Sequence, residues 1–381
     1  MTAKKIVAIM CGGASYEHEV SIISGIQIAQ NIDRKLYKPV FLYFDQADNV
    51  FLIKNFSDNK KDFLKNKRIP VNLIRGVSGL QVQPKVMFTS NTVIDVVFLA
   101  FHGGTGESGA IQGLLELYKT PFTAAGQEGA VVAMNKAITK EALVAHDVPV
   151  LPWVSILSES FHQDKVVSIK EILDKLSLPL IIKPVHLGSS IGITIAKTEV
   201  ELGQQLSIAA RLDSEILLEP ALDDFTEFNI SVRSATSGLE FSPIEEPIRE
   251  GEVLSFDDKY ANGGKKGGDK GSNGGMELLG RTVPAKIPDE LAEEIRGLAA
   301  KVYRACRLSG MLRIDFMYSK GKLYCTEPNP IPGSLAFYLW EAAGETFQQQ
   351  ITQAIEDSLD RHSKKIVIEP YETDIVEKFV G

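Results

Sequence analysis

The sequence has few cysteines and no hydrophobic run long enough to cross a membrane. Its 381 residues include three cysteines, an odd number without CxxC spacing, which favours a reduced setting over a disulfide framework. The longest apolar runs, such as VIDVVFLAF, are far shorter than the roughly 20 residues that a membrane span needs. We therefore expect a cytoplasmic protein that has no transmembrane helix.

An excess of positive charge and a signal peptide are also missing. The 41 Lys and Arg residues are outnumbered by 49 Asp and Glu residues, giving a net charge of −8, so we expect neither nucleic acid nor an anionic membrane as a partner. The N-terminal apolar run leads directly into a glycine turn and has no small-residue cleavage site, which predicts a first strand. The length is sufficient for two or three domains.

The N-terminal third has the pattern of a parallel α/β unit. KKIVAIM, a glycine turn and IISGIQIAQNI predict strand, turn and helix, and KPVFLYFD and VIDVVFLAFHG predict further strands. Residues 54–92 are polar and weakly patterned, so we expect a surface excursion there with one short strand at VMFTS. This pattern predicts a first domain at 1–127.

The remaining chain predicts two further units of mixed α and β structure. A helix at about 129–146, an amphipathic helix near SIKEILDKL and the strands PLIIKP and GITIAK define a small α+β domain at 128–218. A strand-rich region, a strong helix at PDELAEEIRGLAAKVYRAC and a last helix at EAAGETFQQQITQAIEDSL define a third domain at 219–381. Seven glycines between Gly263 and Gly275 predict a mobile loop, which we place at 256–280.

A glycine pattern in the first domain raises the possibility of dinucleotide binding. Gly104, Gly106 and Gly109 fit GxGxxG between a strand and a helix. The acid that would bind the ribose falls near Glu128, which is not at the end of a second strand, and the glycines follow a third strand of the domain instead of the first. These departures argue against an NAD-dependent dehydrogenase.

A second glycine loop, KPVHLGSSIG, follows the predicted strand PLIIKP. It lacks the GK[ST] ending of a Walker A loop, but its small residues would let backbone N–H groups approach phosphate oxygens, and Lys183 adds a positive charge. An ordinary hairpin with a solvated lysine has the same pattern. The loop alone does not separate phosphate binding from a hairpin.

Two strands near the C-terminus predict a polar cluster. In LRIDFMY, Arg313 and Asp315 share one face, and in KLYCTEPN, Glu327 and Asn329 do the same. If the strands pair across the SKGK turn, three oxygen ligands and a guanidinium converge, and such oxygens suit Mg²⁺ bound to nucleotide phosphates. The alternative is a polar sheet face with an Arg–Asp pair.

Taken together, these motifs resemble the ATP-grasp superfamily and, within it, the D-alanine–D-alanine ligase family. The resemblance covers nearly the whole chain and occurs in family order, in the segments GGASYEHEVSIISG, HGGTGESGAIQGLLE, AMNKAITK, IIKPVHLGSSIGI, LLEP, TEFNISV, DDKY, LRIDF and TEPNPIPG. It implies an ATP-grasp fold preceded by a Rossmann-like parallel α/β domain. It also implies a homodimer formed through the first domain.

The resemblance implies an ATP site and a metal site. Lys136 and Lys183 match the lysines that contact the α- and β-phosphates, and Ser190 belongs to the glycine loop that would close over them. Three further positions match nucleotide contacts: Glu219 for the adenine amino group, Glu227 for the ribose hydroxyls and Lys259 near the phosphates and adenine. The segment from Glu219 to Glu227 is about one residue longer than is usual in the family. The positions that match ligands of two Mg²⁺ ions, which Mn²⁺ can replace, are Asp315, Glu327 and Asn329.

The resemblance also implies two amino-acid subsites and a ligation through an acyl phosphate. Glu17 matches the acid that binds the ammonium group of the first D-alanine, and Ser189 and Tyr260 complete its hydrogen-bonded triad. Arg313 and the N–H of Gly333 match the oxyanion hole. His102 lies in the motif that lines the substrate cavity.

The acceptor motif departs from the family pattern. This chain has NPIPGSLAFYLW, so that Tyr338 stands where a carboxylate-binding serine is expected, and Ser334 is the other candidate for that contact. A phenol can donate one hydrogen bond to a carboxylate. The leading prediction is D-alanyl-D-alanine formation for peptidoglycan precursors, and the alternative is a different acceptor such as D-lactate, D-serine or another amino acid. A non-catalytic nucleotide-binding regulator is disfavoured because the lysines, Arg313 and the metal ligands are all present.

Overall fold

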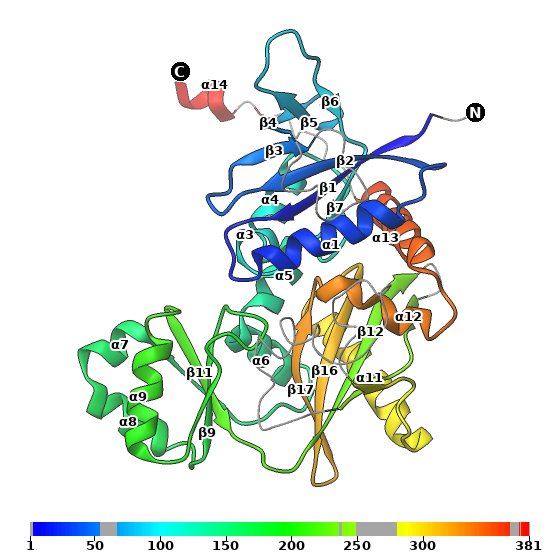
Figure 1. Ribbon diagram of the computed structural model, residues 1–381. Helices are drawn as coiled ribbons and strands as arrows, with labels where there is room; N and C mark the ends of the chain where they lie inside the picture. Colours follow the sequence, from blue (N-terminus) through cyan, green and yellow to red (C-terminus); the bar gives the residue numbers. More distant parts are fainter. Residues whose placement is uncertain are drawn as a thin grey trace.

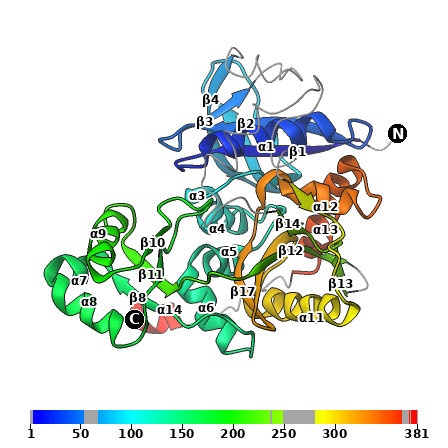
Figure 2. The same ribbon diagram turned by 60° about the horizontal axis from the view of Figure 1, so that its bottom comes forward.

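The computed structural model describes residues 3–53, 67–235, 238–248, 280–365, 373 and 375–380. The described residues form three larger sheets and one two-stranded sheet, and Figures 1 and 2 show the three larger sheets with their helices from two directions. Lys259, Tyr260 and the glycine-rich run from Gly263 to Gly275 lie outside the described residues. The domain boundaries at 127 and 218 stay predictions.

The first sheet has seven strands in the order β6-β5-β4-β3-β2-β1-β7. Its strands are β1 (Lys5–Gly12), β2 (Tyr37–Phe44), β3 (Val50–Ile53), β4 (Arg68–Gly76), β5 (Gly79–Pro84), β6 (Thr92–Val93) and β7 (Val96–Leu99). As predicted, β1 is parallel to both β2 and β7, and its residues from Val7 onward are buried because the sheet is covered on both faces. The helices that follow these strands are α1 (His18–Asn31), α3 (Gly104–Glu107) and α4 (Ala110–Leu117).

The strand predicted at VMFTS is wrong. Strand β5 ends at Pro84, and Val86, Met87 and Phe88 follow it as exposed residues in bends and a turn. The sheet is instead extended by the antiparallel pair β4 and β5. The alternation in β4 buries Ile69 and Val71, whereas the consecutive apolar residues of VMFTS have no face to bury.

The second sheet is antiparallel, in the order β10-β9-β11-β8. Its strands are β8 (Val154–Leu157), β9 (Leu180–Pro184), β10 (Thr194–Ala196) and β11 (Glu215–Pro220). In both ribbon views three helices gather beside it: α7 (Ser158–Gln163), α8 (Lys165–Leu173) and α9 (Glu199–Ala209). The predicted strands PLIIKP and GITIAK pair as β9 and β10, so the loop KPVHLGSSIG joins two neighbouring strands.

The helix predicted at 129–146 is two helices, α5 (Gln127–Met134) and α6 (Lys136–Val144). Asn135 separates them with an extended backbone, φ −114° and ψ 106°, and its side chain caps α6 by accepting the N–H of Ile138. Asparagine competes with helical backbone bonds in this way and is favoured at N-caps. The break places Lys136 at the first position of α6.

The third sheet is antiparallel, in the order β13-β12-β16-β17, and a short pair β14-β15 lies next to it, where Glu245 forms a bridge with Asn229 of β12. The strands are β12 (Thr226–Ala235), β13 (Gly238–Phe241), β14 (Glu246–Pro247), β15 (Arg281–Thr282), β16 (Met311–Ser319) and β17 (Lys322–Asn329). The predicted hairpin across SKGK is confirmed as β16–β17, with Arg313 opposite Asn329 and Asp315 opposite Glu327. Helix α11 (Asp289–Ala305) packs its apolar face on this sheet.

The C-terminal segment returns from the third sheet to the first. It forms η3 (Gly333–Ala336), α12 (Phe337–Glu341), α13 (Phe347–Ser363) and, further on, α14 (Ile375–Val380). Buried Ile351 and Ile355 of α13 join the core of the first sheet, and Tyr37 donates a hydrogen bond to Glu356 at 2.7 Å. This return brings the turn before η3 against the loop after β7 and the end of α3.

Candidate active site

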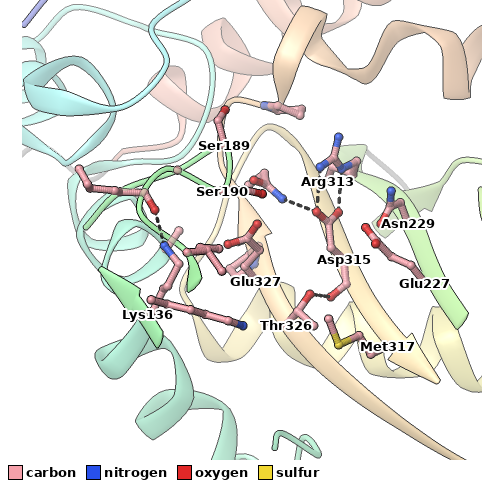
Figure 3. A pocket seen from close by; sticks show the side chains of 18 of the residues that line it. Lys136, Ser189, Ser190, Glu227, Asn229, Arg313, Asp315, Met317, Thr326 and Glu327 are labelled. Carbon is pink, nitrogen blue, oxygen red and sulfur yellow. Dashed lines mark hydrogen bonds and ion pairs between the residues drawn. The ribbon is translucent and has the colours of Figure 1, made fainter. Parts of the chain in front are cut away.

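A cavity of about 250 Å³ lies where the three sheets meet. Figure 3 views it between the loop that carries Ser189 and Ser190 and the strands that carry Arg313, Asp315 and Glu327. Most of the predicted site residues that the structure describes line it, namely Glu17, His102, Lys136, Lys183, Ser189, Ser190, Glu219, Glu227, Arg313, Asp315, Glu327, Asn329, Gly333 and Tyr338. The structure therefore brings together residues that are up to several hundred positions apart in the chain.

The glycine loop bends sharply over the cavity. Ser189, Ser190 and Gly192 all have left-handed backbones, with φ of 51°, 62° and 71°. At Gly188 a Cβ would lie 2.7 Å from Oε2 of Glu17, so a larger residue there would displace the end of that side chain. The small residues of this loop thus permit both the tight turn and the close contact with the first domain.

Glu17 and Ser189, predicted as members of one triad, are in contact. Ser189 donates a hydrogen bond to Oε1 of Glu17, which is buried at the start of α1. Glu17 also lines a second cavity, on the side of Ser15, Tyr16 and Gly103. The carboxylate therefore lies between two hollows, where the ammonium group of a small amino acid can reach it.

The two predicted phosphate-binding lysines line the cavity from different elements. Lys136 on α6 donates a hydrogen bond from Nζ to the carbonyl of Leu187 at 2.5 Å, and burial lowers its pKa. Lys183 on β9 lies 2.5 Å from Oε2 of Glu219. Burial alone would lower the pKa of Lys183, but the charge of Glu219 outweighs it and the pKa is raised.

Lys140 is a site residue that the sequence analysis missed. It forms a buried ion pair with Glu219, so this carboxylate lies between Lys140 and Lys183. Burial would raise the pKa of Glu219, but the two lysines lower it, so the group is ionised in the fold. Lys140 lies four residues after Lys136, and residues four apart share one helix face. This spacing could have predicted that Lys140 faces the same site.

The β16–β17 hairpin holds a hydrogen-bonded polar cluster (Figure 3). Arg313 donates to both carboxylate oxygens of Asp315, at 2.7 and 2.8 Å, and Asn329 donates to Asp315 Oδ2 at 3.1 Å. Burial opposes charging of Arg313, but Asp315 holds its pKa well above the usual value. The structure confirms the predicted convergence of four side chains, those of Arg313, Asp315, Glu327 and Asn329. It also contains the Arg–Asp pair that the sequence analysis gave as the alternative to a metal site.

The oxygen donors of this cluster fit a divalent ion that is shared with a nucleotide. Asp315, Glu327 and Asn329 offer two carboxylates and one amide oxygen, which are ligand types that Mg²⁺ accepts. Within the described ranges, no group of three or more His, Cys, Asp or Glu side chains that could hold a metal was found. Mg²⁺ usually takes one or two carboxylates from a protein and its remaining ligands from waters and phosphates.

His102 and Glu107 hold the turn that leads to Gly333. His102 Nδ1 lies 3.0 Å from the carbonyl of Ile331, and since a carbonyl can only accept, this nitrogen carries the proton while Nε2 accepts from Ser24 at 2.8 Å. Burial lowers the pKa of His102 to about 4, so the ring is neutral. Glu107, which the sequence analysis did not single out, accepts the N–H of Ile331 at 3.1 Å and that of Gly103 at 2.7 Å.

At the far end of the cavity Tyr338 has an intramolecular partner. Its hydroxyl donates a hydrogen bond to Oε2 of Glu245 at 2.8 Å, and the guanidinium carbon of Arg281 lies 3.9 Å from its ring centroid. Ser334, the other predicted acceptor contact, is buried with φ 48° and is not among the described residues that line the cavity. The sequence analysis missed Glu245 and Arg281 because the long segment 249–279 separates them. Sequence periodicity does not relate residues across such a segment.

The GxGxxG glycines of the first domain are required by packing. A Cβ at Gly104 would lie 2.3 Å from the carbonyl oxygen of Ala14, and one at Gly106 would lie 2.1 Å from the ring of Phe101. The turn therefore approaches its own domain closely, which accounts for the pattern without a dinucleotide.

The three sheets and a cavity lined by a glycine-hydroxyl loop, buried lysines and a carboxylate hairpin define an enzyme of the ATP-grasp class. Family models described as D-ala D-ala ligase N-terminus and D-ala D-ala ligase C-terminus match residues 6–125 and 143–356. The chain therefore belongs to the D-alanine–D-alanine ligase family.

Individual relatives resemble the chain over nearly its whole length. A D-alanine–D-alanine ligase from Thermosipho africanus is 31% identical over 363 residues, which is 94% of each chain. A D-alanine–D-alanine ligase A from Chromobacterium violaceum is 32% identical, covering 93% of this chain and 95% of its own.

Solved structures share the fold. The D-alanine–D-alanine ligase from Coxiella burnetii is 26% identical with a TM-score of 0.76, and the match covers 95% of each chain. A D-Ala:D-Ser ligase from Enterococcus faecalis is 24% identical with a TM-score of 0.75, covering 93% of this chain and all of its own, and at that identity the likeness shows the fold alone. Among the described residues, no helix is both long and apolar enough to span a membrane.

Proposed function

We propose that this protein uses ATP to join two D-alanine molecules into D-alanyl-D-alanine for peptidoglycan precursors. The observation that supports this most is the convergence, on one cavity, of the glycine loop, Lys136, Lys183 and the β16–β17 carboxylates in a chain of this family. Each group has a separate task in ligation, and together they describe a site for a nucleotide beside a site for a small amino acid.

The donor D-alanine binds at Glu17. The carboxylate of Glu17, fixed by the hydroxyl of Ser189, would pair with the ammonium group, since a buried charge-assisted bond is strong and directional. Tyr260 would complete the triad. Binding in this orientation leaves the substrate carboxylate pointing toward the glycine loop and the nucleotide.

ATP lies between the glycine loop and the third sheet. Lys136 and Lys183 would contact its α- and β-phosphates, Ser190 and neighbouring N–H groups its phosphate oxygens, and Lys259 its phosphates and adenine. Glu219 and Glu227 would contact the adenine amino group and the ribose hydroxyls. Asp315, Glu327 and Asn329 would hold two Mg²⁺ ions, or Mn²⁺ in their place, and the bound ions would neutralise charge on the phosphates.

The reaction proceeds in two steps. An oxygen of the donor carboxylate attacks the γ-phosphorus of ATP, ADP leaves, and the product is D-alanyl phosphate, which has a far better leaving group than oxide. The neutral amine of the acceptor then attacks the acyl carbon, loses a proton and expels inorganic phosphate. Arg313 and the N–H of Gly333 stabilise the oxyanion of the tetrahedral intermediate. Because water would hydrolyse the acyl phosphate, the site must be closed during turnover.

A different acceptor is the second candidate. The segment that normally supplies a carboxylate-binding serine carries Tyr338 here, so D-lactate, D-serine or another amino acid would be selected by altered contacts. Loss of ligation in favour of a regulatory role is disfavoured, because Arg313, Asp315, Glu327 and both phosphate lysines line one cavity. We further propose that the protein is a cytoplasmic homodimer, assembled through the first domain as the family resemblance suggests.

Phosphate release from ATP and magnesium, measured over a panel of D-amino acids and D-hydroxy acids with products identified by mass, tests this proposal. D-alanine alone should support phosphate release with stoichiometric dipeptide. Stoichiometric ligation of D-alanine only to another panel member would favour the second candidate. Absence of any ligated product from a folded protein that binds ATP would contradict both.

A further inference from the structure

A hydrogen-bonded cluster around Glu245 forms one end of the cavity. Tyr338 and Asn229 both donate to Oε2 of Glu245, at 2.8 and 3.1 Å, and Nη1 of Arg281 lies 3.2 Å from Oε1. Arg281 stacks on the ring of Tyr338, with its guanidinium carbon 3.9 Å from the centroid. The ion pair and the stacking thus orient the guanidinium, whose side chain is 14% exposed, and the hydrogen bonds from Tyr338 and Asn229 hold Glu245.

The cluster lies next to the groups that would stabilise the reacting centre. Arg281, Glu245 and Tyr338 line the same cavity as Arg313 and Gly333. Asn229, which donates to Glu245, is paired across the sheet with Asp315, and Asp315 accepts the hydrogen bonds of Arg313. An amine that attacks an acyl group at Arg313 and Gly333 would therefore extend its own substituents toward this cluster.

Recognition of the acceptor carboxylate needs a donor or a cation at this end. The hydroxyl hydrogen of Tyr338 is donated to Glu245, and Ser334 is outside the described cavity lining. Among the described lining cations, Lys136, Lys140 and Lys183 contact the glycine loop or Glu219, and Arg313 is bound through two bonds to Asp315. Arg281 is also paired, with Glu245, but of these cations it is the one that stacks on Tyr338 at this end of the cavity, and a guanidinium can bind a carboxylate through two parallel N–H bonds.

We infer that Arg281 binds the carboxylate of the acceptor amino acid, and that Glu245 and Tyr338 are positioning residues that orient its guanidinium. This inference rests on the proposed ligase function and specifies its acceptor subsite. It predicts that the preferred acceptors carry a free carboxylate beside the attacking amine. It also explains how the subsite functions with a tyrosine at position 338: the phenol supports the arginine and does not itself contact the substrate.

Internal competition between two acceptors tests this role. D-alanine and D-alaninamide are supplied together with ATP and magnesium, and the ratio of D-alanyl-D-alanine to D-alanyl-D-alaninamide is measured by mass spectrometry. The ratio reports relative kcat/KM for the two acceptors and is insensitive to a general loss of activity. We expect the wild-type protein to favour D-alanine strongly, and Arg281→Gln to reduce the product ratio by about tenfold or more, because the charge-assisted bonds are lost.

Three further variants give the comparison its controls. Arg296→Gln removes an arginine from the surface of α11, where it pairs with Glu293, and should leave the ratio unchanged. Tyr338→Phe keeps the stacking ring but removes the bond to Glu245, and should shift the ratio in the same direction as Arg281→Gln by a smaller factor. Arg281→Lys retains the charge without the paired donors, so an intermediate ratio is expected. This variant provides the test if Arg281→Gln does not fold.

The outcomes separate the inference from the function on which it rests. The role of Arg281 is overturned if folded Arg281→Gln retains the wild-type product ratio. If only Arg281→Lys folds, the same result in that variant overturns it. Failure of the wild-type protein to ligate D-alanine to either acceptor overturns the proposed function instead.

Discussion

Glu107 accepts a hydrogen bond from the backbone N–H of Ile331, a residue 224 positions away in the chain, at 3.1 Å. The bond joins the end of α3 to the turn that precedes Gly333, and His102, in the loop after β7, holds the carbonyl of the same residue. Because Gly333 supplies a proposed oxyanion donor, this clamp determines where that donor lies. Glu107 is therefore a positioning residue, and its protonation state affects the stability of the site.

The buried position of Glu107 predicts a pH-dependent stability. Burial, together with the charge of Glu17, raises its pKa from 4.5 to about 8. A carboxyl whose pKa is higher in the folded state contributes stability that is fully present below pH 4.5 and is lost as the pH rises toward about 8. We expect the free energy of unfolding of the ligand-free protein to fall over this interval.

Urea unfolding of wild type, Glu107→Gln and Glu141→Gln at a series of pH values checks this expectation. The amide at position 107 cannot titrate, so that variant should show a flatter profile across the interval. Glu141 is exposed on α6, and its variant should follow the wild type. Parallel profiles for wild type and Glu107→Gln would show that this carboxyl is ionised throughout.

Replacement of Glu327 tests the metal site. Glu327→Gln retains the shape of the side chain but removes a negative charge from the proposed Mg²⁺ ligands. We expect turnover to fall by at least about a hundredfold, which is roughly 3 kcal/mol in activation free energy, with unchanged unfolding behaviour. Steady-state phosphate release over a range of Mg²⁺ concentrations, with circular dichroism as the folding control, measures both. A folded variant with wild-type turnover would rule out Glu327 as a metal ligand.

Glu17 and Ser189 test the donor subsite. Glu17→Gln removes the charge that would pair with the ammonium group, so the KM for the donor D-alanine should rise by about tenfold or more. Ser189→Ala should raise it less, because the carboxylate remains. Glu19→Gln, on the exposed face of α1, is the matched control. In kinetics that resolve the two amino-acid sites, both variants should have a nearly unchanged KM for ATP. A change in the KM for ATP alone would contradict the proposed role.

The sequence predicted local features of this molecule better than those that depend on distant segments. The β16–β17 hairpin followed from two alternating strands and a short turn, so the opposition of Asp315 and Glu327 could be read from period and spacing. The pairing of Glu17 with Ser189 had no such local basis. It was predicted because family motifs supply contacts across domains.

The errors have equally specific physical causes. The prediction of a strand at VMFTS was wrong because it rested on apolar composition alone, and these residues have no buried face to pack against. The prediction of one long helix at 129–146 was wrong because it overlooked the preference of Asn135 for a helix N-cap. The links from Glu107 to Ile331 and from Glu245 to Arg281 join segments whose approach depends on tertiary packing. Periodicity and spacing in the chain contain no information about such approaches.

The pairing of Glu219 with two lysines predicts that Lys140 stabilises the fold. Lys140 and Glu219 are both buried, and the carboxylate has Lys183 as its second partner at 2.5 Å. Lys140→Met keeps an apolar stem of similar length but leaves Glu219 with one cation. We expect the free energy of unfolding to fall by about 3 kcal/mol. This is the lower part of the range for breaking a buried ion pair, because Lys183 still compensates part of the charge. Lys175→Met makes the same chemical change at an exposed position and should change stability by less than about 0.5 kcal/mol. Urea unfolding of the three proteins at neutral pH measures the difference. Equal stability of Lys140→Met and Lys175→Met would mean that Lys183 alone neutralises Glu219, and that Lys140 contributes to this end of the cavity through its position and not through its charge.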